Sequence, residues 1–161
     1  IITHRPVVAS GWYEDFNKIF YQTDYRFGSN SEGYSIHNLI TKQNPFVYFA
    51  SMQDLRGSSI IGGGFNKNNL IFDTYWDCVI IDEAHEGNKT ELAQSVHKHL
   101  KRSFTLELSG TPFNLFEDYE DEDDIYTWDY VMEQQAKHEW DQNNFGDSNP
   151  YDSLPKLSIF T

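Results

Sequence analysis

Apolar residues gather into short runs that alternate with polar, glycine-rich stretches, and this pattern predicts strands and helices in alternation. Strands are expected near residues 1–4, 45–50, 78–82, 104–108 and 157–161. The run at residues 78–81 has four apolar residues in succession, so we expect its strand to be buried on both faces of a sheet.

Between these strands, apolar residues recur at a spacing of three or four, which predicts helices. Longer helices are expected at residues 11–20, 88–102 and 125–141, and shorter ones at 34–41 and 70–76. Ser10 is a candidate N-cap for the first of them. Strands joined through helices favour an α/β fold with a mostly parallel sheet and helices packed on its faces.

Composition narrows the class of protein. The 161 residues suffice for one domain with a core, and the formal charge of −13 argues against a free-standing nucleic-acid binder. The one cysteine, Cys78, allows no disulfide within the chain and suggests a cytoplasmic setting. No apolar run approaches the roughly 20 residues of a membrane span.

Two stretches are predicted to lack regular structure. Seven of the eight residues at 117–124 are acidic, and their spacing fits no calcium loop, so we expect a solvated acidic loop. Residues 142–155 are linker-like and precede the last expected strand.

Candidate chemistry lies at the end of the central strand. Asp82 and Glu83 follow the apolar run directly, and a parallel α/β sheet binds its ligands at the carboxyl ends of its strands. Adjacent carboxylates at such an edge suit a nucleotide and Mg²⁺ site. One acid can hold the metal through water, while the next accepts a proton from an attacking water.

Two motifs carry a resemblance to a known family. Asp82-Glu83-Ala84-His85 resembles the DEAH box, and Ser109-Gly110-Thr111-Pro112 resembles the Ser/Thr-rich motif that follows it in superfamily 2 helicases and DNA translocases. The amino-acid sequence around both motifs, from residue 1 to about 116, is similar to that of the motor domain in restriction subunits of type I or type III restriction-modification systems.

This resemblance implies a partial RecA-like motor domain over residues 1–161, a three-layer α/β/α P-loop NTPase fold that works with ATP and Mg²⁺. It implies that Asp82 holds Mg²⁺ through water and that Glu83 orients and deprotonates the attacking water. His85 would sense the site, and Ser109 and Thr111 would couple hydrolysis to strand movement.

The resemblance also implies contacts with double-stranded DNA at Thr3, His4 and Arg5, and at Ser51 and Gln53. Hydroxyl, amide and guanidinium groups at loop tips can bond phosphate oxygens. A plain turn at the first tip and a helix N-cap at Ser51 are the alternatives. Implied partners are a second motor domain, a nuclease domain and modification or specificity subunits.

One part of the ATP site is missing from the sequence. No Gly-x-x-x-x-Gly-Lys-Ser/Thr occurs, and Gly62-Gly63-Gly64, which we interpret as a flexible linker, has no Lys-Ser/Thr pair directly after it. We therefore expect a fragment that hydrolyses ATP poorly by itself. The alternatives are a fragment of a DEAH-type RNA helicase, a non-catalytic scaffold domain, or an Asp82-Glu83 pair that merely precedes a helix.

Overall fold

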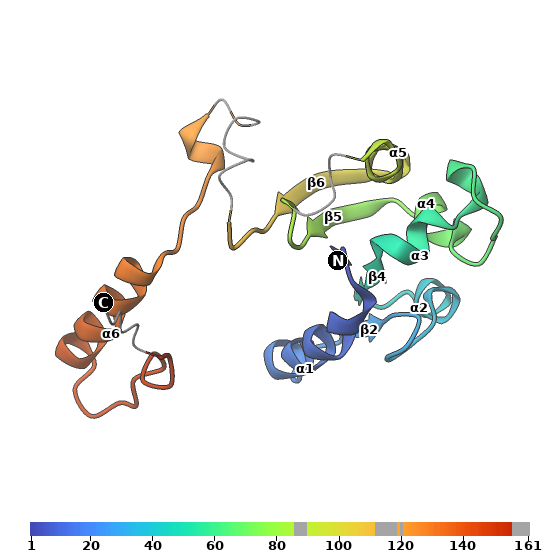
Figure 1. The fold of residues 1–161 in the computed structure, drawn as a ribbon. Helices are drawn as coiled ribbons and strands as arrows, with labels where there is room; N and C mark the ends of the chain where they lie inside the picture. Colours follow the sequence, from blue (N-terminus) through green and yellow to red (C-terminus); the bar gives the residue numbers. More distant parts are fainter. Residues whose placement is uncertain (86–89, 112–118, 120, 156–161) are drawn as a thin grey trace. The chain divides into compact units, whose positions relative to one another are not determined.

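The computed structural model describes residues 1–85, 90–111, 119 and 121–155. The chain divides into two compact units, residues 1–117 and 118–161, where the sequence predicts one partial domain. Figure 1 shows the strands of the described residues within the first unit. The expected strand at 157–161 lies outside the described residues.

The first unit is built on a parallel sheet of four strands in the order β4-β1-β5-β6. The strands are β4 (Ala50–Ser51), β1 (Ile2–Thr3), β5 (Trp76–Ile81) and β6 (Arg102–Glu107). A second parallel pair joins β2 (Arg26–Gly28) to β3 (Phe46–Tyr48). The predicted α/β fold with a parallel sheet flanked by helices is therefore confirmed.

Helices connect these strands, and four of the five lie where the sequence predicts a helix, whereas the one at residues 52–56 is not predicted. They are α1 (Ala9–Phe20), α2 (Ile36–Lys42), α3 (Met52–Arg56), α4 (Asn69–Asp73) and α5 (Glu91–His99), with short 3₁₀ helices η1 (Pro6–Val8) and η2 (Ser59–Ile61). Among the described residues, no helix is long and apolar enough to cross a membrane.

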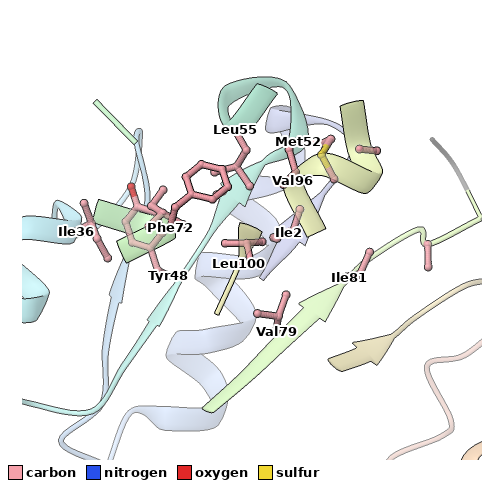
Figure 2. Close-up of a cluster of buried hydrophobic side chains, with 14 of the residues drawn as sticks. Ile2, Ile36, Tyr48, Met52, Leu55, Phe72, Val79, Ile81, Val96 and Leu100 are labelled. Atoms are coloured by element: carbon pink, nitrogen blue, oxygen red, sulfur yellow. The ribbon is translucent and has the colours of Figure 1, made fainter. Parts of the chain in front are cut away.

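The helices pack on two clusters of buried apolar side chains. Figure 2 shows the larger one, in which Ile2, Val79 and Ile81 of the sheet pack with Leu55 of α3 and Val96 of α5. The smaller cluster places Phe27 and Phe49 against α1. Tyr48 and Ala50 belong to the larger cluster and Phe49 to the smaller one, as expected for an extended segment whose side chains alternate between faces.

Several sequence predictions at this level are wrong. No strand is predicted between residues 4 and 45, yet β2 lies at Arg26–Gly28. The first helix begins at Ala9 behind η1, so Ser10 lies inside it and does not cap it. The expected flexible linker at the three glycines is a hydrogen-bonded turn, because the Gly63 N–H donates to Ser58 O at 2.7 Å.

The central strand is buried on one face only. Val79 and Ile81 are buried, whereas Cys78 is exposed. On the neighbouring strand, Phe104 pairs with Cys78 and is 72% exposed. The prediction of burial on both faces is wrong, because β6 lies at the edge of the described sheet and its outward side chains have little cover.

The second unit contains η5 (Glu122–Asp124), within the predicted acidic loop, and α6 (Tyr130–Asn143). Its linker-like segment folds back on α6, where Tyr151 contacts the rings of Trp128 and Trp140. The Asn149 amide donates to Lys137 O at 2.8 Å.

Candidate nucleotide and DNA site

The carboxyl ends of the parallel strands bring most of the predicted site residues to one edge of the sheet. Thr3 ends β1 and pairs with Ser51 at the end of β4. Ile2 pairs with Ile81, so Asp82 follows at the same edge of the sheet. The position of Asp82 is fixed by its N–H, which donates to Ile2 O at 2.8 Å.

Asp82 is partly buried, and both of its carboxylate oxygens accept a hydrogen bond. The Glu83 N–H donates to Oδ1 at 3.1 Å, and the Trp12 indole N–H donates to Oδ2 at 3.3 Å. Each carboxylate oxygen can accept about two bonds, so both keep a lone pair for water. This donor set fits a magnesium ion held through water, which prefers one or two carboxylates and keeps several waters.

Glu83 has a backbone conformation that favours glycine. Its φ of 53° lies in the left-handed region, which costs a residue with a side chain about 1–2 kcal/mol. Such strain is found at functional sites, where the surrounding structure maintains it. The Glu83 side chain is half exposed, so its carboxylate can reach a ligand at the sheet edge.

His85 links this turn to the next strand. Its Nδ1 lies 2.6 Å from Ser109 Oγ and 3.3 Å from Glu83 Oε2. Ser109 Oγ also accepts the Thr111 N–H at 3.2 Å. The two predicted motifs therefore touch through His85 and Ser109, whereas Pro112 lies outside the described residues.

The predicted DNA-contact residues differ in accessibility. Thr3 is 2% exposed, and its hydroxyl donates to Arg5 O at 2.7 Å, so it stabilises the tip from inside. His4 is partly buried, and Arg5 is exposed. Arg5 is thus the side chain of this tip best placed to reach a phosphate.

At the second tip, Ser51 acts as a helix N-cap. It is 1% exposed, accepts the Asp54 N–H at 3.1 Å and donates to Asp54 Oδ2 at 2.8 Å. Burial raises the pKa of Asp54, but hydrogen bonds from Ser51 and Asn30 and the charge of Lys67 hold it below its usual value overall. Gln53 is exposed beside this cap.

The described residues contain no cluster of three or more His, Cys, Asp or Glu side chains that could hold a metal. A magnesium ion at Asp82 would therefore need ligands from water and phosphate. Sequence reasoning missed Trp12 as a partner of Asp82, since the two residues are 70 positions apart and share no motif.

Comparison with known proteins gives one family. Residues 1–114 match the family model described as "Type III restriction enzyme, res subunit". No curated protein sequence matches the chain. The matched region includes every site residue described above.

Proposed function

Because the chain belongs to the family of type III restriction enzyme res subunits, we propose that it supplies the acid side of the ATP site in a DNA translocase motor. The family implies a helicase-like motor of a restriction enzyme in the full-length protein. The finer proposal concerns which residues of this chain hydrolyse ATP and which face double-stranded DNA.

One observation carries the proposal: the strained turn at residues 82–85 lies at the carboxyl edge of a parallel sheet and contacts the Ser109 motif. Phosphoryl transfer is mostly positioning and charge neutralisation, so few groups at one edge suffice. We assign Asp82 to hold Mg²⁺ through water and Glu83 to orient the attacking water and take its proton. When bound, Mg²⁺ neutralises the charge that develops on the ATP phosphates.

His85, Ser109 and Thr111 form the coupling part of this proposal. The 2.6 Å contact joins the turn after β5 to the loop after β6, so a shift of one loop displaces the other. Ser109 also anchors the Thr111 N–H. We assign these residues to link hydrolysis to movement along DNA.

The DNA side of the proposal rests on the exposed tips. We assign Arg5 and Gln53 to contact phosphates, while Thr3 and Ser51 hold the two backbones that present them. His4, which is partly buried, belongs to the same tip as Arg5. With a charge of −13, the chain needs basic surface from elsewhere to hold DNA firmly.

The remaining partners follow from the proposed motor. The sequence contains no Gly-x-x-x-x-Gly-Lys-Ser/Thr, so we assign the phosphate-binding loop to residues outside these 161. A second motor domain, a nuclease domain and modification subunits complete the proposed assembly, which acts in the cytoplasm.

The test is a Glu83→Gln substitution in the intact restriction subunit. We expect kcat for DNA-stimulated ATP hydrolysis to fall at least about a hundredfold, because the base that activates water is lost. KM for ATP should change little, since the substitution keeps the size of the side chain. The matched control is Glu91→Gln, an exposed acid in the first turn of α5, which should leave kcat intact. Unchanged hydrolysis in the Glu83 variant would refute the proposal.

A further inference from the structure

Trp12 joins α1 to the candidate ATP site. Its indole packs partly buried against the smaller apolar cluster, next to Phe27 and Phe49. Its N–H donates to Asp82 Oδ2 at 3.3 Å. An indole can only donate, so it can orient the carboxylate but cannot compete with it for a metal.

Asp82 is held by this part of the chain in two ways. Its backbone N–H donates to Ile2 O at 2.8 Å, and its side chain accepts from Trp12. Between Ile2 and Trp12 lies the tip at residues 3–5, followed by η1 and the start of α1. One short segment therefore carries the exposed Arg5 and also binds both the backbone N–H and the carboxylate of Asp82.

We propose that Trp12 is a positioning residue that orients the Asp82 carboxylate for Mg²⁺ and transmits DNA contact at the tip to this acid. The proposal rests on the proposed function, because it assigns Asp82 to the metal. With Oδ2 held by the indole, the side chain keeps one rotamer and its free lone pairs keep one direction. A shift of α1 on DNA binding moves the indole and so changes that direction.

The first experiment asks whether the bond exists, without ATP. In the full chain, the indole N–H resonance of Trp12 is assigned by its loss in Trp12→Phe. Asp82→Ala should then move this resonance upfield, because a charged acceptor has been removed. The control is Asp77→Ala, an exposed acid on the same strand, which should leave it in place. A Trp12 indole N–H resonance that does not shift in Asp82→Ala would overturn the proposal.

The second experiment asks what the bond does in the intact restriction subunit. Trp12→Phe keeps the apolar packing and loses the N–H. We expect the Mg²⁺ concentration for half-maximal ATP hydrolysis to rise about fivefold, as for the loss of one hydrogen bond. Stimulation by DNA should fall, while KM for ATP at saturating Mg²⁺ stays unchanged.

The matched control is Trp76→Phe. The Trp76 indole donates to Ile71 O at 2.9 Å in the larger core, so this substitution also removes one indole bond but lies away from the acids. An equal Mg²⁺ response in both variants would overturn the proposal. An intact subunit without ATP hydrolysis would instead refute the proposed function, and the resonance experiment would still decide the Trp12 bond.

Discussion

The contact between His85 and Ser109 connects the two motifs, and a double-mutant cycle measures the energy of this contact. The variants are His85→Ala, Ser109→Ala and both together in the full chain. The free energy of unfolding of all four proteins gives the coupling energy of the pair. A real hydrogen bond makes the double substitution cost less than the sum of the single ones.

The structure sets the expected size of this coupling. Nδ1 and Oγ are 2.6 Å apart, and the His85 side chain is 21% exposed. A typical hydrogen bond contributes a net of about 0.5–1.5 kcal/mol, so we expect about 1 kcal/mol. Glu83 Oε2 lies 3.3 Å from His85 Nδ1 and can replace the Ser109 hydroxyl as its hydrogen-bond partner. This replacement lowers the cost of the Ser109→Ala substitution. The Thr111 N–H loses its acceptor in both Ser109 variants and cancels in the cycle.

The assay is urea unfolding followed by circular dichroism, with equal dependence on urea required of all four proteins. The control cycle uses Asp15 and Lys18, an exposed ion pair at 3.0 Å on α1, whose coupling should be close to zero. A coupling energy for His85 and Ser109 no larger than that of the control would refute the proposed interaction between the motifs. In the intact subunit, Ser109→Ala should then retain ATP hydrolysis but move less DNA per ATP.

Three further predictions concern the chain by itself. The 161-residue chain should show no Mg²⁺-dependent ATP hydrolysis above the background of its Glu83→Gln variant, as measured by phosphate release. Burial, and to a smaller extent the charge of Arg102, lower the pKa of His97, so the unfolded chain binds a proton at His97 more readily than the folded chain. Stability should therefore fall as the pH drops below about 6.5. His97→Gln should reduce this loss of stability, as measured by urea midpoints between pH 5 and 8. Val96 is fully buried on α5, so Val96→Ala should cost about 2 kcal/mol in urea unfolding, clearly more than Leu92→Ala at an exposed position of the same helix.

The sequence predicts best what short-range pattern decides. The apolar run before Asp82 forms β5, and the residues after it lie at the carboxyl edge of a parallel sheet, as expected from strands joined through helices. The apolar spacing of residues 88–102 likewise predicts α5, which in the structure begins at Glu91. The assigned roles of the site residues stay predictions.

Features that depend on distant partners escaped prediction. The three residues of β2 have no apolar pattern of their own and become a strand by pairing with β3, about 20 positions later. Exposure of Cys78 follows from what covers the sheet and not from the apolar run that contains it. The start of α1 was misplaced because Pro6 opens a 3₁₀ turn that leads into the helix.

The turn at residues 82–85 is hydrogen-bonded on both sides, to the segment that contains β1 and α1 and to the end of β6. On the β1 side, Ile2 O and the Trp12 indole bind Asp82. On the β6 side, Ala84 N–H donates to Leu108 O at 2.9 Å, and His85 meets the Ser109 hydroxyl. The strained Glu83 lies between these two anchors, which maintain its left-handed backbone conformation. We therefore expect a displacement of either neighbouring segment to shift Asp82 and Glu83 through these hydrogen bonds.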